Sequence, residues 1–185
     1  LGTSPAILGL VAEAGMVGNT EAPVLISGER GVGKELLARV IHGASARSRM
    51  PMMTINCGAI PEALLEPELF GHARGSSPGG SGARRGILEA AHGGTVLFDE
   101  IGETSGRMQA RLLRFLEGGE IQRLGGAPGI VDVRVISATT RDLYEQTREG
   151  AFRDDLFYRL NVVHLVIPPL RKRREDIGVL LHHSL

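Results

Sequence analysis

Short apolar runs alternate with amphipathic stretches along the chain. The apolar spacing from Pro5 to Val17 predicts a first helix, and "APVLISG" at 22–28 predicts a buried parallel strand, because it is rich in aliphatic residues and ends in glycine. The pattern repeats, with helices predicted near 34–43, 61–69, 84–92 and 105–118 and strands at 52–57, 95–100, 133–139 and 162–167. Strands that alternate with helices favour a three-layer α/β fold with a mostly parallel sheet.

Two segments depart from this alternation. Residues 119–133 predict a hairpin, and "RGSSPGGSGARR" at 74–85 has almost nothing to bury. Taken alone, a Gly/Ser-rich stretch is typical of a solvated linker. The chain before it has too few strands to close a core of its own, so we predict a single domain over 1–185 with an inserted loop at 71–86.

Composition narrows the class of protein. With 42% hydrophobic and 23% charged residues, the chain is typical of one soluble globular domain. Lys+Arg and Asp+Glu both number 21, which excludes the basic field that drives non-specific binding to nucleic acid. No apolar run approaches the roughly 20 residues that span a bilayer, and the start lacks the charge of a signal peptide. We therefore expect a cytoplasmic protein with no membrane contact.

Cysteine usage adds one further limit. Cys57 is the only cysteine in the sequence, which excludes an internal disulfide and a multi-cysteine zinc site. Such usage fits a reducing compartment. We expect Cys57 to be a small buried side chain.

The stretch "GERGVGKE" at 28–35 fits the pattern GxxxxGK between a predicted strand and a predicted helix. In this context the glycines let backbone N–H groups surround an anion, the helix N-terminus adds partial positive charge, and the lysine reaches the outer phosphates. The predicted cofactor-binding residues are Gly28, Glu29, Arg30, Gly31, Val32, Gly33, Lys34 and Glu35, with Asp99 added below.

Magnesium needs ligands that this loop alone does not supply. Glu35 stands where such loops usually carry Ser or Thr, so either its carboxylate acts through water or other groups hold the metal. The strand "GGTVLFDE" at 93–100 ends in two carboxylates, at the sheet edge where α/β proteins bind ligands. We predict that Asp99 holds Mg²⁺ and that Glu100 orients and polarises the attacking water.

Two arginines in "AFRDDLFYRL" have a weaker signal. Arg153 and Arg159 are separated by less than two helical turns. Spacing alone favours two ordinary surface arginines. The alternative is an arginine that reaches the γ-phosphate in an adjoining subunit, which can contribute roughly 10³ to 10⁵ in rate.

Together these segments resemble the AAA+ ATPase domain of the bacterial sigma-54-dependent transcription activators. The resemblance is carried, in the order of that family, by "GERGVGKELLARVIH", "INCGAIPEALLEPELFGH", "GGTVLFDEIGE", "QARLLRFLEGGEIQRLGG", "VDVRVISATTRDL" and "FRDDLFYRLNVVHLVIPPLRKRREDI". It implies a P-loop NTPase core that hydrolyses ATP with Mg²⁺, usually as a hexameric ring. In that family glutamate commonly follows the lysine, so Glu35 agrees with ATP binding.

The resemblance also implies residue roles. Lys34 would bind phosphate, Asp99 and Glu100 would form the Walker B pair, and Asn56 would hold the catalytic glutamate idle until the partner engages. Thr139 and Thr140 fall at the first sensor, where Thr140 replaces the usual asparagine. Arg153 and Arg159 would be the two arginine fingers that act in trans.

The inserted loop falls where this family presents its GAFTGA motif to the sigma factor. The corresponding residues are Gly75, Ser76, Ser77, Pro78, Gly79 and Gly80. The flanking glycines are kept, but Ser77 replaces the aromatic residue and Pro78 the threonine. An aromatic side chain contributes about 1.5 to 3 kcal/mol at full burial, so we expect weakened contact with sigma-54.

The family's domain continues beyond "REDI" into a helical lid and then a DNA-binding helix-turn-helix, so DNA contact is expected only through a domain outside this sequence. We expect "RKRRED" at 171–176 to be a solvated helix start and not a nucleic-acid patch.

Three functions stay open at this point: an ATP-hydrolysing activator of sigma-54 RNA polymerase, an AAA+ transcription regulator that does not engage sigma-54, and a nucleotide-binding module with negligible turnover, for which Thr140 is the hint.

Overall fold

The computed structural model describes residues 2–73, 82 and 84–184. Its centre is a five-stranded sheet in the order β2-β5-β8-β1-β9, and each neighbouring pair is parallel. These strands are β1 (Val24–Ser27), β2 (Met52–Asn56), β5 (Thr95–Asp99), β8 (Arg134–Thr139) and β9 (Val163–Val166). The prediction of a mostly parallel α/β sheet is confirmed.

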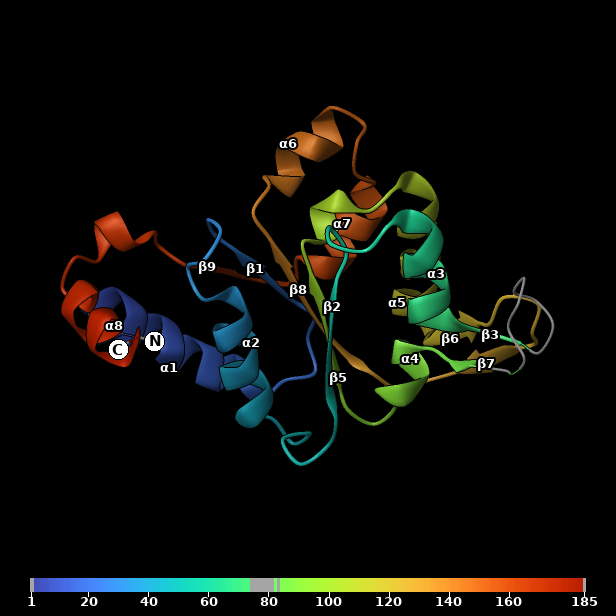
Figure 1. Ribbon diagram of the computed structural model, residues 1–185, viewed down its shortest axis with the longest axis horizontal. Coiled ribbons are helices and arrows are strands. Elements are labelled where there is room, and N and C mark those ends of the chain that lie inside the picture. Colours follow the sequence, from blue (N-terminus) through green and yellow to red (C-terminus); the bar gives the residue numbers. More distant parts are fainter. Residues whose placement is uncertain (1, 74–81, 83, 185) are drawn as a thin grey trace.

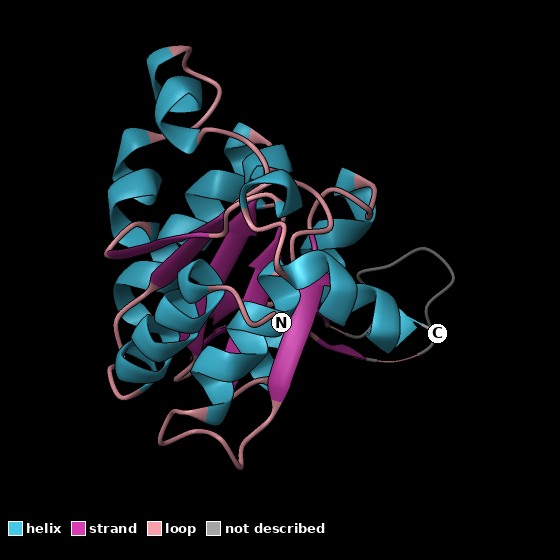
Figure 2. Cartoon of the chain, turned by 90° about the vertical axis from the view of Figure 1, so that its left-hand side faces the viewer, coloured by secondary structure: helices cyan, strands magenta, loops and turns pink. Residues whose placement is uncertain are grey.

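Helices cover both faces of this sheet, as Figures 1 and 2 show. The helices are α1 (Pro5–Gly18), α2 (Lys34–Gly43), α3 (Glu62–Phe70), α4 (Ile87–Ala90), α5 (Gly106–Gly118), α6 (Leu143–Arg148), α7 (Asp154–Leu160) and α8 (Asp176–Ser184), with 3-10 turns η1 (Ile101–Glu103) and η2 (Leu170–Lys172). The apolar faces of α1 and α2 pack on one face of the sheet, and those of α3, α4, α5 and α7 on the other.

The continuous apolar runs in the sequence reflect strands that are buried on both faces. In β1, Val24 and Ile26 pack with α1 and α2, whereas Leu25 between them packs in the cluster on the opposite face. In β5, Leu97 and Phe98 divide in the same way. Side chains alternate across a strand, so each run of consecutive apolar residues supplies both cores.

The predicted helix near 84–92 is wrong in its first part. Only Ile87–Ala90 are helical, because β4 (Arg84–Arg85) pairs antiparallel with β3 (Gly71–His72). The close approach depends on glycine: a Cβ added at Gly86 would lie 2.2 Å from the Leu69 carbonyl oxygen. The expected hairpin is present as β6 (Glu120–Gln122) and β7 (Pro128–Ile130).

The expected solvated helix start at 171–176 is also partly wrong. Arg173 and Asp176 are 4% and 0% exposed. Asp176 accepts hydrogen bonds from the backbone N–H groups of Thr3 and Ser4, at 2.6 and 2.7 Å, and from the Ser4 hydroxyl. Arg173 donates to the Val32 carbonyl at 2.9 Å. The segment therefore ties α8 to the start of α1 and to the loop after β1.

Two smaller expectations concern burial and surface charge. Cys57 is buried, and burial, with a further contribution from Asp99, raises the pKa of its thiol to about 12.

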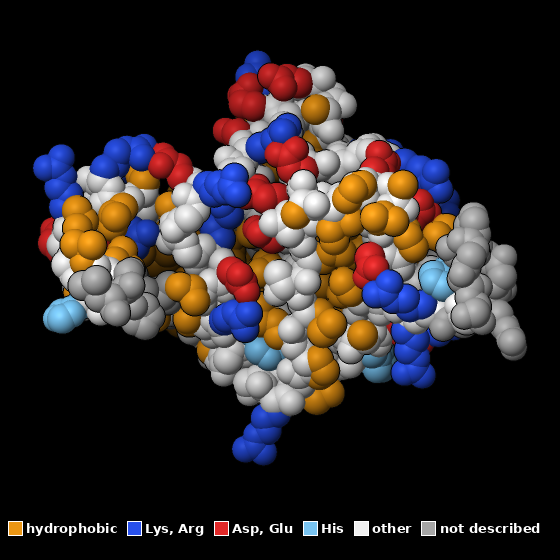
Figure 3. All heavy atoms as spheres, viewed as in Figure 1, with side chains coloured by type: hydrophobic (Ala, Val, Ile, Leu, Met, Phe, Trp, Pro, Cys, Tyr) orange, Lys and Arg blue, Asp and Glu red, His pale blue; other side chains and the backbone are white. Residues whose placement is uncertain are grey.

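Acidic and basic side chains are interspersed on the face drawn in Figure 3, in keeping with the balanced charge of the chain. Within the part of the chain that is described, no helix is long and apolar enough to cross a bilayer.

Candidate functional site

The loop between β1 and α2 turns sharply at two glycines. Gly31 and Gly33 have φ values of 78° and 104°, in the left-handed region that favours glycine, and Gly33 is the N-cap of α2. Such a loop brings the N-terminus of α2, with its unpaired N–H groups and partial positive charge, to the carboxyl edge of the sheet. This is the geometry of an anion-binding loop.

Lys34 is the first residue of α2 and is only 7% exposed. Its Nζ donates to the carbonyl oxygens of Gly28 and Glu29 at 3.0 and 3.2 Å. A third contact runs to Glu100, whose Oε1 lies 3.6 Å away. The ammonium group is therefore held at the junction of the loop and the end of β5.

Glu100 follows β5 with φ 53° and ψ 48°, and among the described residues no other non-glycine residue has a positive φ. This conformation turns its side chain toward β8, where Oε2 accepts hydrogen bonds from the Thr140 N–H at 3.0 Å and the Thr140 hydroxyl at 2.8 Å. Backbone strain of this kind concentrates at functional sites.

Asp99, by contrast, faces β2. Asn56 Nδ2 donates to its Oδ2 at 3.0 Å, and the Glu100 N–H donates to its Oδ1 at 3.1 Å. The family resemblance implied that Asn56 holds Glu100, but here Asn56 contacts Asp99, because these two residues are directly paired in the β2–β5 register. Burial and the charge of Glu100 raise the pKa of Asp99, and Lys34 opposes that shift.

These groups open into a cleft of about 920 Å³ at the carboxyl ends of the parallel strands. Its walls include the predicted residues Glu29, Arg30, Gly31, Gly33, Lys34, Glu35, Asn56, Asp99, Glu100 and Thr140. Gly28 and Val32 do not line it, and Val32 packs instead into the core on the α1–α2 face. A buried lysine, a helix N-terminus and two strand-end carboxylates suit the cleft to a polyanion with its cation.

A second hollow of about 710 Å³ adjoins the first across Gly31, Gly33 and Leu36. Its walls are largely apolar and include Val32, Val40 and Val179, so that α2 and α8 face each other across it. The two together offer an apolar recess next to a charged cleft, the combination that a nucleotide requires.

Two acidic residues that line the cleft, Glu29 and Glu35, form ion pairs at its rim. Arg39 binds Glu35 at 2.7 Å, one helical turn along α2. Arg171 binds both carboxylate oxygens of Glu29, at 2.6 and 2.7 Å, and this hydrogen bonding lowers the pKa of Glu29. The described residues contain no cluster of three or more His, Cys, Asp or Glu side chains that could hold a metal ion alone.

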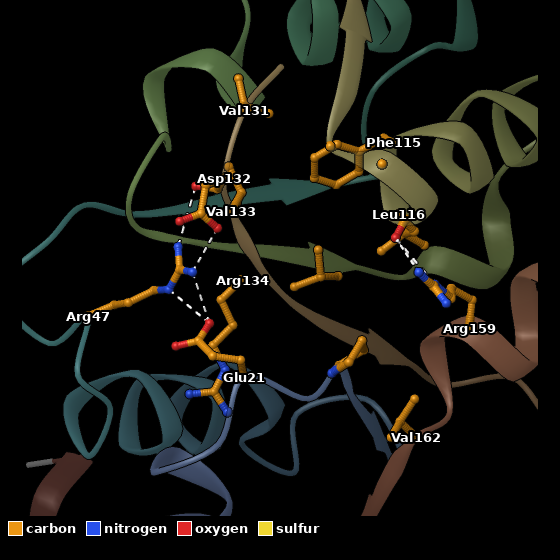
Figure 4. A pocket seen from close by; sticks show the side chains of 14 residues that line it. Glu21, Arg47, Phe115, Leu116, Val131, Asp132, Val133, Arg134, Arg159 and Val162 are labelled. Carbon is orange, nitrogen blue, oxygen red and sulfur yellow. Dashed lines mark hydrogen bonds and ion pairs between the residues drawn. The ribbon is translucent and has the colours of Figure 1, made fainter.

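Neither predicted finger lines this cleft. Arg153 is the N-cap of α7 and pairs at the surface with Asp155, at 2.7 Å. Arg159 donates to the Leu116 carbonyl at 3.1 and 3.2 Å, on the wall of a separate cavity of about 660 Å³ that is shown in Figure 4. That cavity lies where β1, β8 and β9 begin, at the opposite edge of the sheet.

The predicted partner-loop residues Gly75, Ser76, Ser77, Pro78, Gly79 and Gly80 lie outside the described residues. Strands β3 and β4, which flank these residues in the sequence, are described. Arg84 binds Glu68 at 2.7 Å, and Arg123 of the β6–β7 hairpin binds both oxygens of Glu89. Ion pairs thus fix β4 and the hairpin to α3 and α4.

Sequence reasoning missed two buried amides near the site. The side chains of Gln109 and Gln146 both donate to carbonyl oxygens of the turn that follows Glu100, and Gln109 also bonds the backbone of residues 151 and 153. No motif marks them. The available signal is a glutamine at a position on α5 that the apolar periodicity assigns to the core.

The chain matches the family model of the Sigma-54 interaction domain over residues 1–166. It is 52% identical over 186 residues to Regulatory protein AtoC of Escherichia coli (strain K12), a match that covers 100% of this chain and 40% of that protein. Transcriptional regulatory protein ZraR of the same organism is also 52% identical over 186 residues, covering 100% of this chain and 42% of ZraR.

Solved structures of related proteins have a similar fold. The crystal structure of NtrX from Brucella abortus has a TM-score of 0.93 and 40% identity, over 98% of this chain and 41% of that one. NtrX in complex with ATP gives a TM-score of 0.90 and 38% identity, over 99% of this chain and 41% of that one. The chain spans about two fifths of the length of these relatives. It belongs to the Sigma-54 interaction domain family and has the AAA+ P-loop NTPase fold.

Proposed function

We propose that the chain binds ATP, with the phosphates at Lys34 and the base in the adjoining apolar hollow, and hydrolyses it. The convergence of Lys34, Asp99 and Glu100 at one sheet edge carries this proposal. Structures of Brucella abortus NtrX with ATP and with ADP support it, because the chain matches both over nearly its whole length.

Lys34 can exchange its present partners for phosphate. Its ammonium group donates to two neutral carbonyl oxygens, and charge-assisted hydrogen bonds to phosphate are roughly twice as strong. The N-terminus of α2 adds its partial positive charge in the same direction. Phosphate binding therefore gains from groups that are already in place.

Mg²⁺ fits the residues present. This ion is usually held by one or two carboxylates together with substrate phosphates, and Asp99 is a carboxylate at the strand end that lines the cleft. Glu35 could contribute only through water, since it pairs with Arg39 at the rim. When bound, the cation would neutralise charge on the phosphates.

Glu100 is the proposed general base for the attacking water. In the present arrangement Thr140 donates two hydrogen bonds to its Oε2, and these bonds occupy an oxygen that would take the proton from water. We infer that Thr140 holds Glu100 idle and that the base acts once these bonds loosen. The role that the family implies for Asn56 would then be exerted through Asp99.

Lys34→Ala tests nucleotide binding. We expect ATP affinity to fall by more than about tenfold, because a charge-assisted contact is worth roughly 1.5 to 3 kcal/mol. Lys172→Ala, at the chain's other lysine, is the matched control, because Lys172 lies outside the cleft. Titration calorimetry with ATP checks both. Equal affinity in wild type and Lys34→Ala would refute the proposed phosphate site.

Arg153 and Arg159 are proposed to act on the nucleotide of a neighbouring subunit in a ring, in the hexameric form that the family resemblance implies. The support is that neither side chain lines the cleft of its own chain. Arg153 is exposed, and within the described part of the chain its guanidinium is held by Asp155 alone, so it can exchange that carboxylate for phosphate.

The broader role is that of the ATPase core of a transcription regulator that remodels sigma-54 RNA polymerase through residues 75–80, and family membership supports it. The sequence of that loop favours a second candidate, a regulator that does not engage sigma-54, because Ser77 and Pro78 replace the contact residues. Binding of the chain to sigma-54 with an ATP transition-state mimic separates the two. Tight binding identifies the activator, and no binding identifies the second candidate.

A further inference from the structure

Two buried glutamines lie between the turn that follows Glu100 and the segment that leads to Arg153. Gln109 on α5 and Gln146 on α6 are 1% and 8% exposed. A buried amide costs free energy unless its hydrogen bonds are made. The partners of these two side chains therefore indicate what the fold uses them for.

Gln109 holds three backbone groups from two separate segments. Its Nε2 donates to the carbonyl oxygens of Thr104 and Ala151 at 2.9 and 3.0 Å, and its Oε1 accepts from the Arg153 N–H at 2.9 Å. Thr104 is the C-cap of η1, the turn that begins directly after Glu100. One side chain thus links the turn at the proposed base to the backbone of the proposed finger.

Gln146 makes a second link between the same segments. Its side-chain Nε2 donates to the Gly102 carbonyl at 3.3 Å, and its Oε1 has no hydrogen-bond partner among the described residues. Its backbone carbonyl accepts from the N–H groups of Ala151 and Phe152, at 2.9 and 3.0 Å. Gly102 packs so closely that a Cβ there would lie 2.9 Å from Gln146 Oε1. Residues 151–153 are therefore fixed from both α5 and α6.

The Arg153 side chain lies at the surface, where it pairs with Asp155, whereas its backbone N–H is hydrogen-bonded to the buried Gln109. The turn η1 and the Arg153 backbone are each hydrogen-bonded directly to Gln109, so one side chain joins the two segments.

We propose that Gln109 is a positioning residue, which couples the state of a subunit's own cleft, through η1, to the placement of the Arg153 that it offers to its neighbour. The inference rests on the proposed trans role of Arg153. Hydrolysis in one subunit would then depend on the state of the next subunit's cleft, because η1 begins directly after the proposed base.

Gln109→Met keeps the length of the side chain and removes all three hydrogen bonds. In the intact protein we expect kcat to fall about 10²-fold, the effect of a misplacement of about 1 Å. The KM for ATP should change little, because Gln109 does not line the cleft. Gln122→Met, the same change at an exposed position on β6, is the matched control and should retain wild-type turnover.

Subunit mixing distinguishes positioning from misfolding. Gln109→Met subunits keep a working base, and Glu100→Gln subunits keep a well-placed Arg153. Mixed assemblies should therefore regain turnover that neither variant has alone, at interfaces where a Glu100→Gln subunit serves a Gln109→Met cleft. A misfolded Gln109→Met subunit would not be rescued.

Turnover of a mixture of Arg153→Ala and Glu100→Gln subunits is measured in parallel as the reference for the trans role. If this second mixture regains turnover and the Gln109→Met mixture does not, the positioning role of Gln109 is wrong while the trans role of Arg153 stands. If neither mixture regains turnover, the trans role fails and the inference fails with it. A rise in KM with unchanged kcat in Gln109→Met also overturns the inference.

Discussion

At the scale of single residues, the end of β5 sends two adjacent carboxylates to different neighbours. Asp99 pairs with Asn56 on β2, and Glu100 pairs with Thr140 beyond β8, because its left-handed backbone reverses its direction. That conformation costs a non-glycine residue about 1 to 2 kcal/mol. This conformation places the Glu100 carboxylate in contact with both Lys34 and Thr140.

The members of the cleft could be predicted from sequence, whereas their pairing could not. Lys34 and Asp99 were found because a glycine loop and a strand end have local patterns. The Glu100–Thr140 and Asn56–Asp99 contacts join residues 40 and 43 positions apart. Glu100 reaches Thr140 through its own left-handed backbone, whereas Asp99 reaches Asn56 through the β2–β5 register, and no local pattern specifies either contact.

Asp99→Asn should abolish turnover and change how the stability of the nucleotide-free protein depends on pH. Burial raises the pKa of Asp99, so its charged form opposes folding, and that cost appears as pH rises through the raised pKa. Over that range the unfolding temperature of the wild type should fall relative to that of the variant, and each 1 kcal/mol corresponds to roughly 2 to 4 °C in a chain of this size. A constant offset is expected beside it, because both oxygens of Asp99 accept hydrogen bonds and asparagine has only one acceptor oxygen. Thermal unfolding across pH checks this, and a difference between the two proteins that does not change with pH would contradict it.

At the scale of elements, hydrophobic alternation determines the sheet and its two helical layers, and glycine contacts and buried charges determine how the ends join. The β3–β4 pair could not be predicted, because it depends on the contact between Gly86 and the Leu69 carbonyl, which only the folded chain creates. The burial of Asp176 was missed for a similar reason. Its partners, Thr3 and Ser4, lie at the far end of the sequence.

Asp176→Asn should loosen α8 from α1. Burial alone would raise the pKa of Asp176, but hydrogen bonds from Ser4 and Thr3, with the charge of Arg173, lower it. A lowered pKa contributes stability that is present above the ordinary value of 3.8 and is lost as pH falls through the folded-state pKa. We therefore expect the variant to unfold several degrees below wild type at neutral pH, with the gap closing in acid.

Asp154→Asn is the matched control for that experiment. Asp154 lies in the first turn of α7, as Asp176 does in α8, but is exposed. A similar loss of stability in both variants would mean that the general effect of an acid at a helix start, and not the bonds to α1, explains the result.

At the scale of the whole molecule, the sheet separates two sites. The cleft with Lys34 lies at the carboxyl edge, and Arg159 lies over a cavity at the amino edge. Neither Arg153 nor Arg159 lines the cleft of its own chain. Under the proposed trans role, assembly is part of the chemistry and turnover per chain depends on protein concentration.

Turnover per chain should therefore rise with protein concentration over the range in which assemblies form. Sedimentation measured in parallel with ATP hydrolysis tests this in the intact protein. Arg153→Ala should assemble over the same range and yet stay slow at every concentration, because the finger is missing from each interface. Constant turnover per chain, from monomer to assembly, would remove the trans role.

The most direct test of ATP hydrolysis at this cleft is a paired measurement of ATP affinity and turnover in Glu100→Gln. Loss of a general base costs about 10² to 10⁴ in rate, so turnover should fall by that factor while the Kd for ATP stays close to wild type. Glu117→Gln, at an exposed carboxylate on α5, should leave both unchanged. Turnover near wild type in Glu100→Gln would contradict the account, because another group would then be activating the water.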